Sequence, residues 1–499
     1  MMFDYRRSAP LHELPVLSTT ELCGHLHQAL VDGWRLLGLF GLQEASGVGL
    51  CCVLCHDPSR RLQAVRTPCL ENFSSMTPSC PQVHYFEREI HEQWGLEPQG
   101  HPWLKSVRRI PDAPVTPHGD TANAPTPYPF YRVEGGHVHE VAVGPVHAGV
   151  IEPGHFRFQC YGENVLHLEI ALGYQHRGME DMFVHGPGER RLPLAECIAG
   201  DTSVGHALAH CVLLERLTDT KIPHRAQLVR RIGLELERLA NHVGDLGAIA
   251  GDTGFLPTAS WNGRIRGDFL NMTATLCGNR FGRGLVRPGG VAHDLSPAQC
   301  ADLLARARSA GRDALGSAEV LLHSPSACER LTGVGVLSKE YALQLGVVGV
   351  AARACGLPLD ARQHAPLSDL SCEGCMPRTE SSGDVMARTL VRRHELEDSL
   401  RLLEADLSAL AGLPAEPAAT EDIRALPPDT LAVAQVEGWR GEICHMAVTG
   451  PDGRLAAYKI VDPSFRNWPG LAVALRNNQI SDFPLCNKSF NLSYCGHDL

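Results

Sequence analysis

The central part of the chain carries apolar residues at helical spacing. Leu228 and Ile232 belong to a series that recurs every three or four residues between 223 and 250, so one face of this segment is apolar while Arg and Glu occupy the other. Segments 296–324 and 384–410 show the same pattern. Several long amphipathic helices are typical of a helical bundle, which we expect to form the main part of the fold.

Shorter apolar runs flank this block. Residues 51–55, CCVLC, alternate inside an apolar run and are most simply a buried strand. From Thr430 onward the pattern alternates, as in LAVAQVEGWRGEICHMAV, which predicts a small hairpin or sheet packed on the bundle. We therefore predict an α+β fold, in which a small N-terminal α/β domain precedes a large, mainly helical domain with small β elements at its start and C-terminus.

Two segments rich in Pro and Ala interrupt these patterns, at 112–130 and 411–429, and both are typical of linkers or extended loops. The first separates the N-terminal block from the helical one. We place the N-terminal domain at 1–112, a linker at 113–137 and the main domain at 138–499.

Composition narrows the function classes. The chain has 45 basic and 56 acidic residues, a net charge of −11, and no long basic run, so nucleic acid is not an expected partner. Its most apolar stretch, 345–359, is shorter than the roughly 18 residues of a membrane-crossing helix and contains Arg353. The 18 Cys residues are scattered, and MMFDYRRSAP lacks the apolar core of a signal peptide, so we expect a reducing, cytoplasmic location.

The segment 144–158, GPVHAGVIEPGHFRF, contains three groups that suit proton transfer, His147, Glu152 and His155. Its Gly and Pro residues predict a loop between two strands. Imidazole titrates near neutral pH, and burial shifts a carboxylate towards it, so these side chains could relay protons. A polar turn with ordinary hydrogen bonds is the alternative, and the spacing matches no standard zinc pattern.

Two further polar segments have competing interpretations. Asp201, Thr202 and Ser203 precede a predicted helix, where they suit capping. Cys372 and Cys375 form a CxxC between Gly and Pro residues, which suits a metal or redox loop. Because no second pair lies nearby in the sequence, two surface thiols are the simpler interpretation.

Several blocks, in this order, resemble one family. They are LGYQHRGMEDMF, ECIAGDTSVGHALAHCVLLERL, PHRAQLVRRIGLELERLANHVGDLGAIAGD, RPGGVAHD and GDVMARTLVRRHELEDSLRLL. With 144–158 they resemble the large subunit shared by energy-converting nickel–iron hydrogenases, formate hydrogenlyase (hydrogenase-4 component G) and complex I (its 49-kDa subunit), from about residue 138 onward. YFEREIHEQWGLEPQGHPWLKSVRRI, at 85–110, is similar to the 30-kDa complex I subunit, which hydrogenlyase large subunits carry fused in front.

The resemblance implies a nickel site whose ligands are missing here. Hydrogenases of this branch bind nickel through two thiolates before the HALA helix and two near the C-terminus. Gap-free alignment places these positions at Ala199, Thr202, Ser493 and Gly496. Because nickel in this setting requires soft thiolate donors, we predict a nickel-free chain. Cys197 and Cys495 lie close by but out of register.

In complex I the corresponding cavity receives a quinone headgroup. By resemblance its loop His matches His155 or His147, and its quinone-contacting Tyr matches His206. An imidazole with a pKa near 6.5 gives up a proton more readily than a phenol near 10. The catalytic candidates are His147, Glu152, His155, Asp201, His206, Arg353, Asp360 and Arg362. For Asp360, which matches a family DxR element, a structural ion pair is an equal alternative.

Three hypotheses follow. The first is a catalytic-type subunit of a nickel-free, hydrogenase-related oxidoreductase that couples electron transfer, with quinone as a candidate acceptor, to proton or ion translocation. The second is a non-catalytic scaffold that docks an iron–sulfur subunit to a membrane arm, and the third is a true hydrogenase with unusual ligands.

The resemblance also implies partners and a location. We expect an iron–sulfur small subunit that holds a 4Fe–4S cluster, as the corresponding small subunit of complex I does, together with a ferredoxin-like subunit. Antiporter-like and quinone-channel-like membrane subunits are also expected. The chain itself is expected to bind no cofactor and to lie on the inner face of the cell membrane.

Overall fold

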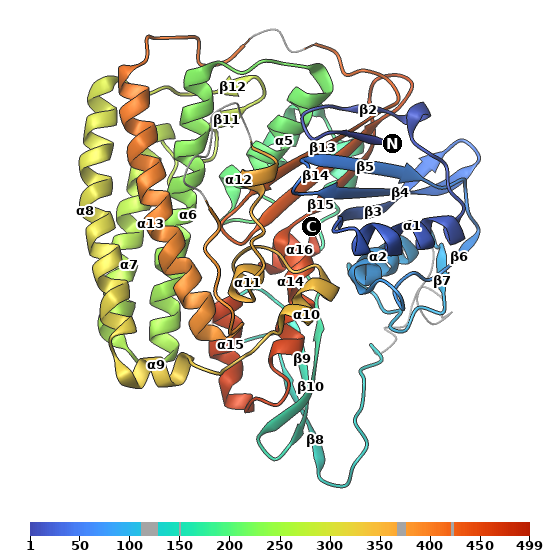
Figure 1. The fold of residues 1–499 in the computed structure, drawn as a ribbon, viewed down its shortest axis with the longest axis horizontal. Coiled ribbons are helices and arrows are strands. Elements are labelled where there is room, and N and C mark those ends of the chain that lie inside the picture. The colour runs from blue at the N-terminus through green and yellow to red at the C-terminus, as the bar shows by residue number, and fades with distance from the viewer. Residues whose placement is uncertain (111–127, 149–150, 367–375, 421–423) are drawn as a thin grey trace.

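Four long helices form one side of the molecule (Figure 1). The computed structural model describes residues 1–110, 128–148, 151–366, 376–420 and 424–499. The four helices are α6 (His224–Asp252), α7 (Leu256–Cys277), α8 (Pro297–Leu322) and α13 (Val385–Gly412). Their apolar faces meet in one core, which confirms the predicted bundle. Most of the predicted linker at 113–137, and Cys372 and Cys375, lie outside the described residues.

A four-stranded antiparallel sheet stands beside the bundle. Its order is β15 (Leu455–Val461), β14 (Glu442–Thr449), β13 (Thr430–Glu437) and β2 (Ala9–Pro10). Successive side chains of a strand point to opposite faces. Ala432 and Ala434 face the core shared with the bundle and α5 (Ser203–Thr218), whereas Leu431 and Val433 face the N-terminal part. The predicted C-terminal sheet is confirmed, and both of its faces are covered.

The N-terminal part is a second antiparallel sheet with helices on it. The sheet order is β1 (Met2–Asp4), β5 (Arg61–Arg66), β4 (Gly47–His56) and β3 (Arg35–Glu44), and the helices are α1 (Thr19–Val31) and α2 (His84–Trp94). Residues 51–55 lie in β4 and are buried, as predicted. Where β3 crosses the C-terminal sheet, a β carbon on Gly38 would stand 2.4 Å from Met446 Cε, so the two sheets pack without space for a side chain there. The division at 1–112 and 138–499 stays a prediction.

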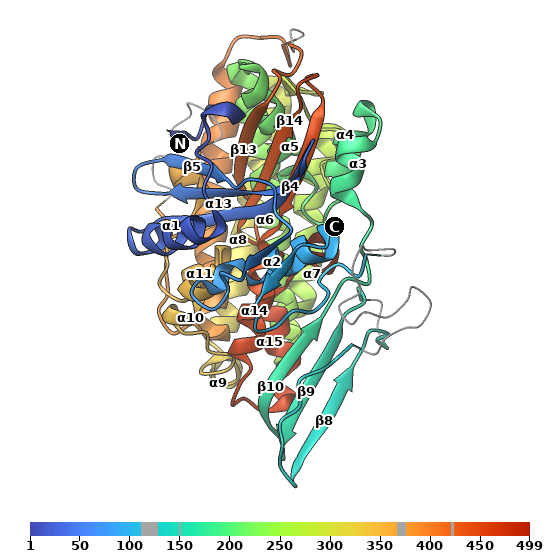
Figure 2. The same cartoon turned by 90° about the vertical axis from the view of Figure 1, so that its right-hand side faces the viewer.

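A third sheet extends away from the body (Figure 2). It consists of β8 (Val138–Val143), β9 (His155–Tyr161) and β10 (Asn164–Ala171) in the order β10-β9-β8. The segment with His147 and Glu152 joins β8 to β9, as predicted, and His155 opens β9.

Short elements complete the described parts. They are β6 (Asn72–Ser74), β7 (Glu97–Gln99), β11 (Val286–Arg287), β12 (Gly290–Val291), α3 (Met179–His185), α4 (Arg191–Ala195), α9 (Pro325–Leu331), α10 (Lys339–Leu345), α11 (Gly349–Ala354), α12 (Ala361–His364), α14 (Pro463–Ala474), α15 (Phe483–Phe490) and α16 (Tyr494–Asp498). Within the described ranges, none of the helices combines the length and apolar character needed to span a membrane.

Candidate functional site

The start of α5 and the start of α16 meet at one place, which we call the corner and define as residues 197–202 together with 493–496. Arg177 joins the two segments, because its guanidinium donates hydrogen bonds to the carbonyl oxygens of Cys197 (2.8 Å), Ile198 (2.9 Å) and Cys495 (3.1 Å). The structure therefore brings together the two sequence segments that carry the four aligned nickel-ligand positions.

The hydroxyl groups at these positions are engaged in the protein's own hydrogen bonds. Thr202 Oγ1 accepts from Trp439 Nε1 at 3.1 Å and from Arg440 at 3.3 Å. Ser493 Oγ accepts from the backbone N–H of Gly496 at 2.9 Å and so caps α16. Both hydroxyls are hard donors with partners of their own, so they do not fit a nickel ion that is bound through thiolates.

Two thiols lie next to these positions, out of register with the alignment. Burial and the adjacent Glu152 raise the pKa of Cys495 to about 11, so its sulfur carries a proton at neutral pH, which a metal ion would have to displace in order to bind. Its Sγ lies 3.3 Å from Ser493 Oγ. Cys197 is exposed. Among the residues that the structure describes, no group of three or more His, Cys, Asp or Glu side chains is arranged to hold a metal ion.

The first turn of α5 is capped from another helix, and the predicted local capping is wrong. Thr202 occupies the N-cap position without a side-chain hydrogen bond to the helix, and Ser203 Oγ donates to the carbonyl oxygen of Glu196 instead. The carboxylate of Glu237, on α6, accepts from the N–H groups of Val204 (2.7 Å) and Gly205 (3.2 Å). Burial raises the pKa of Glu237 to about 8. A titrating carboxyl therefore lies beneath the corner.

Asp201 holds the corner to the turn between β13 and β14. Its two carboxylate oxygens lie 2.6 and 2.7 Å from the guanidinium nitrogens of Arg440. Burial alone would raise the pKa of Asp201, but the Arg440 charge outweighs it and keeps this pKa below its usual value. Arg440 also donates to the carbonyl oxygen of Asn491, just before α16. Asp201 is thus a positioning group with a fixed negative charge.

His206 lies one turn into α5 and is fully buried. Its Nε2 is 3.0 Å from Asp462 Oδ2, and its Nδ1 is 3.1 Å from His445 Nε2. Asp462 in turn touches Gly496, since a β carbon there would stand 2.7 Å from the Asp462 carboxyl carbon. Both ring nitrogens of His206 are therefore occupied, and His206 contacts the corner through Asp462.

The three loop candidates separate into two groups. Glu152 is half-buried at the corner, where it accepts from the N–H groups of Tyr494 (3.4 Å) and Cys495 (3.3 Å). His147 and His155 bond instead within their own loop, to the carbonyl oxygens of Gly154 at 3.0 Å and Gly144 at 2.8 Å. Burial lowers the pKa of His155. Only Glu152 of the three touches the corner directly.

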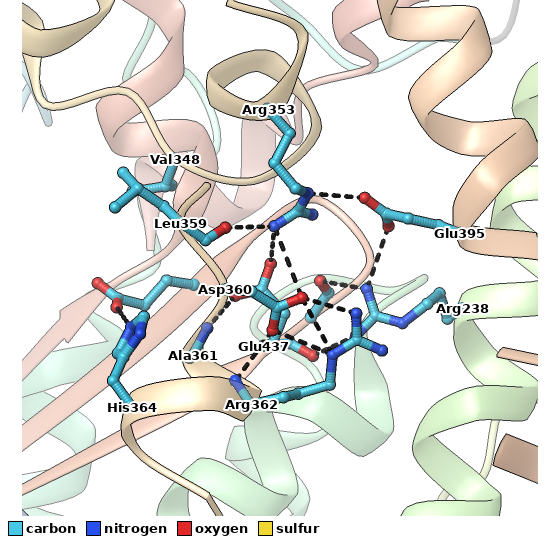
Figure 3. A network of polar contacts seen from close by, with 12 residues as sticks. Arg238, Val348, Arg353, Leu359, Asp360, Ala361, Arg362, His364, Glu395 and Glu437 are labelled. Carbon is cyan, nitrogen blue, oxygen red and sulfur yellow. Dashed lines mark hydrogen bonds and ion pairs between the residues drawn. The ribbon is translucent and has the colours of Figure 1, made fainter. Parts of the chain in front are cut away.

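Arg353, Asp360 and Arg362 belong to a buried ionic network (Figure 3). Arg353 donates to Glu395 and to Glu437, each at 2.8 Å. Arg362 pairs with Asp360 at 2.7 Å. The charge of Arg362 holds the pKa of Asp360 below its usual value although burial opposes it. The predicted ion pair of Asp360 is present, and Glu437 ends β13 just before the turn that carries Arg440 to the corner.

This network contains more acidic than basic side chains. Its ionic members are Glu235, Asp360, Glu395, Glu437, Arg238, Arg353 and Arg362. Four carboxyl groups face three guanidinium groups, and burial lowers the pKa of the adjacent His242, which keeps that imidazole neutral. Burial, followed by the charge of Asp360, raises the pKa of Glu437. Glu437 is therefore the carboxyl group of this network whose charge is compensated least.

Several of these groups were missed at the level of sequence. They are Glu237, Glu395, Glu437, Arg440, His445 and Asp462. Asp462 stands in VDPSF, a pattern typical of a helix N-cap, and it does cap α14 by accepting from the N–H of Ser464 at 2.7 Å. Nothing in that pattern points to the second contact, with His206, which comes from a helix more than two hundred residues earlier.

Comparisons with known proteins match both parts of the chain. Residues 23–120 match the 30 Kd subunit of respiratory-chain NADH dehydrogenase, and residues 252–433 match the 49 Kd subunit. Hydrogenase-4 component G of Escherichia coli is 31% identical over 442 residues, which cover 85% of this chain and 75% of the relative. The alpha subunit of the membrane-bound hydrogenase of Pyrococcus furiosus is 30% identical over 365 residues, covering 69% and 83% of the two chains.

A solved structure shows the same fold. It belongs to the membrane-bound sulfane sulfur reductase, an archaeal respiratory membrane complex, and it matches with a TM-score of 0.66 at 26% identity. The match covers 73% of this chain and 99% of the other. The chain therefore belongs to the family of oxidoreductase large subunits that includes hydrogenase-4 component G and the 49-kDa subunit of complex I, with a 30-kDa-subunit part fused in front.

Proposed function

We propose that the chain is the catalytic-type large subunit of a nickel-free, membrane-associated oxidoreductase complex that couples electron transfer to proton or ion translocation. The observation that carries this proposal is the corner. Its four aligned ligand positions contain no sulfur, and the carboxylate of Asp462 stands beside Gly496, in the space that a longer side chain there would need. Acidic and imidazole side chains surround this place, namely Glu152, Glu237 and His206.

Beside the hydrogenases, the relatives include proteins whose names point to redox chemistry other than hydrogen turnover. One solved relative belongs to a complex named for the reduction of sulfane sulfur. NADH-quinone oxidoreductase subunit 4 of Thermus thermophilus is 29% identical over 364 residues, which cover 68% of this chain and 89% of the relative. We propose a quinone as the acceptor class. Because both ring nitrogens of His206 are occupied, the headgroup would meet the Glu152 side of the corner first.

Partners follow from the same reasoning. We expect this chain to hold no redox centre, and such a chain needs a neighbour that brings electrons to the corner, so we propose that a small subunit with a 4Fe–4S cluster binds there and receives electrons from a ferredoxin-like subunit. We further propose antiporter-like and quinone-channel-like membrane subunits, which would hold this chain against the inner face of the cell membrane.

The experiment is metal analysis and turnover of the complex purified through an affinity tag on this chain, beside a nickel–iron hydrogenase treated identically. We expect iron and acid-labile sulfide from the partner subunits, less than one tenth of a nickel per chain (on the order of background binding), and no hydrogen evolution from reduced viologen. Reduction of decylubiquinone should be measurable. One nickel per chain would overturn the nickel-free assignment, and a complex that reduces neither quinone nor sulfane sulfur would favour the scaffold.

A further inference from the structure

A continuous row of hydrogen bonds leads from the corner through the interior. Beyond His206 and His445, the row continues from His445 Nδ1 to the hydroxyl of Tyr458 at 2.9 Å, and from that hydroxyl to His210 Nδ1, also at 2.9 Å. His206 and His210 lie on α5, whereas His445 lies on β14 and Tyr458 on β15. The row thus crosses between α5 and the C-terminal sheet.

Each hydrogen bond of this row can be given one donor and one acceptor if all donors point towards Asp462. A neutral imidazole has one N–H donor and one acceptor nitrogen, and a phenol has one O–H. If His210 donates to Tyr458, Tyr458 can donate to His445, His445 to His206, and His206 to Asp462. Each of the four hydrogen bonds then contains one proton, every imidazole is neutral, and Asp462 is an anion. No group has to donate twice.

The surroundings favour this protonation state. All five side chains are buried, and the most exposed of them, Tyr458, keeps 4% of its surface. Burial lowers the pKa of His210 to about 3 and lowers that of His445 well below its ordinary value, so both imidazoles are neutral. Burial would raise the pKa of Asp462, but its hydrogen bond with His206 and the charge of Arg440 keep it low.

The row reaches a pocket between the N-terminal part and α3 at Tyr458. Tyr458 lines this pocket together with Gln93, Glu180, Asp181, His185 and Lys459. Asp181 and His185 are largely exposed and lie 3.6 Å apart, so they can exchange protons with solvent. The ring of Tyr458 is held by Phe183, which stacks on it at 4.3 Å between centroids.

We propose that Tyr458, His445, His206 and Asp462 form a proton path that carries protons from this pocket to the acceptor bound at the corner, with His210 positioning the Tyr458 hydroxyl. The inference rests on the proposed function. In one passage His206 Nε2 gives its proton to Asp462, and His206 Nδ1 takes one from His445 Nε2. His445 Nδ1 takes the proton of the Tyr458 hydroxyl.

The outer half of the passage completes the balance. Tyr458, which lines the pocket, regains its proton from a water there, while His210 Nδ1 keeps its own proton and donates a hydrogen bond to the phenol oxygen. The Asp462 carboxyl then protonates an oxygen of the acceptor, which two electrons from the partner's cluster have reduced. A quinone takes two protons for these two electrons, so two passages complete its reduction. No electron travels along the path, and ring rotation restores the starting orientation.

Tyr458→Phe is the sharpest test, since it removes one oxygen and keeps the ring that stacks on Phe183. His445→Gln is the second variant, because an amide still forms hydrogen bonds but does not exchange one proton for another. His364→Gln serves as the matched control, since His364 is a buried imidazole that bonds to Asp57 and Glu442 rather than to the path. Each variant is made in the full chain and purified as the complex.

Two rates are followed by stopped flow. The first is reduction of the partner's cluster by dithionite without quinone, and the second, after excess dithionite is removed, is proton uptake from a dilute buffer with a pH-indicator dye when the reduced complex is mixed with decylubiquinone. We expect both path variants to reduce the cluster at the wild-type rate and to take up protons about 100-fold more slowly, the size of a lost acid–base step. The solvent deuterium effect on their quinone turnover should increase. The control should match wild type.

The outcomes separate the path from the function on which it rests. Wild-type proton uptake that both path variants retain at full rate would overturn the path and leave the proposed function standing. A wild-type complex that reduces its cluster but takes up no protons with quinone would overturn both. Slower cluster reduction in a path variant but not in the control would show a structural role and would also overturn the path.

Discussion

Asp462 and Gly496 are in direct contact, and the carboxylate of the first fills the space that a side chain on the second would need. A β carbon on Gly496 would lie 2.7 Å from the Asp462 carboxyl carbon and 2.8 Å from Oδ2. This contact joins the C-terminal turn to His206, because the same oxygen accepts the hydrogen bond from His206 Nε2.

Introducing a cysteine at this position should therefore destabilise the fold unless Asp462 is also shortened. We expect Gly496→Cys to lower the free energy of unfolding by about 1–3 kcal/mol through overpacking. In a double-mutant cycle with Asp462→Ala, the combined loss should be smaller than the sum of the two single losses. Chemical denaturation of the four proteins measures this coupling. Gly263→Cys, at an exposed position with open space, is the control, and additive losses would contradict the contact.

Arg353 should contribute strongly to stability, since it bonds to two buried carboxyl groups and compensates the charge of Glu395. Arg353→Met leaves Glu395 and Glu437 without their 2.8 Å partner, and removal of one member of a buried ion pair costs about 3–5 kcal/mol. Arg264→Met removes exposed pairings with Asp268 and Asp313, each worth roughly 0–1 kcal/mol. Equal midpoints of denaturation for the two variants would show that the network contributes no more than a surface pair.

Glu237 predicts a pH dependence of stability. The pKa of Glu237 is about 8 in the folded chain and 4.5 when the side chain is free in water, as in the unfolded chain. Between pH 4.5 and 8 the unfolded chain therefore loses a proton that the folded chain keeps. The free energy of unfolding of the wild type is therefore unaffected by the titration of this group below pH 4.5, and it falls by about 1.4 kcal/mol per pH unit as the pH rises from 4.5 to 8.

The test compares wild type with Glu237→Gln, which cannot titrate. Chemical denaturation at pH 5, 6, 7 and 8 (roughly unit steps across that window) should show that the free energy of unfolding of the variant rises steadily relative to that of the wild type. The prediction concerns how this difference changes with pH, because the amide also weakens the cap on α5 and lowers the free energy of unfolding of the variant by the same amount at every pH. A constant difference would mean that the hydrogen bonds from Val204 and Gly205 keep Glu237 ionised.

Glu152 should matter for turnover rather than for assembly. Glu152→Gln keeps an oxygen that can accept from the N–H groups of Tyr494 and Cys495 but removes the titrating proton. We expect the complex to assemble and its proton-coupled turnover to fall about 100-fold. Glu163→Gln, in the exposed turn between β9 and β10, should have no effect. Unchanged turnover in both Glu152→Gln and His206→Phe would support the scaffold hypothesis.

Local patterns were sufficient to predict the elements but not their shared surfaces. The helix predicted from Pro223 begins at His224, and those at 296–324 and 384–410 differ from the structure by one or two residues at each end. Amphipathic periodicity depends on neighbours within a few residues, so one sequence reveals it. The packing of the N-terminal sheet on the C-terminal one depends on contacts such as that of Met446 with Gly38. Nothing in the residues around Gly38 in the sequence indicates this contact.

The site was predictable in its segments and not in its pairings. Resemblance led to the start of α5 and to the C-terminal turn, and the structure places them together. The partners of those residues lie on other elements: Glu237 replaces the expected local cap, and Arg440 pairs with Asp201. A carboxylate on one helix and an N–H on another become neighbours only after packing, and neither residue type is unusual where it stands in the sequence.

The pairing of β2 with β13 has a consequence for the order in which the chain can fold on the ribosome. Arg35, in the sheet that packs against that junction, bonds to Glu442, which is 407 residues further along. Apolar side chains of the N-terminal sheet share a core with Leu431, Val433 and Met446. The strands that cover one face of the N-terminal sheet are therefore synthesised last, and this face is exposed during most of translation. Exposed apolar surface in a nascent chain favours aggregation. We expect synthesis of this chain to depend on a chaperone that shields the N-terminal sheet until the C-terminal strands emerge.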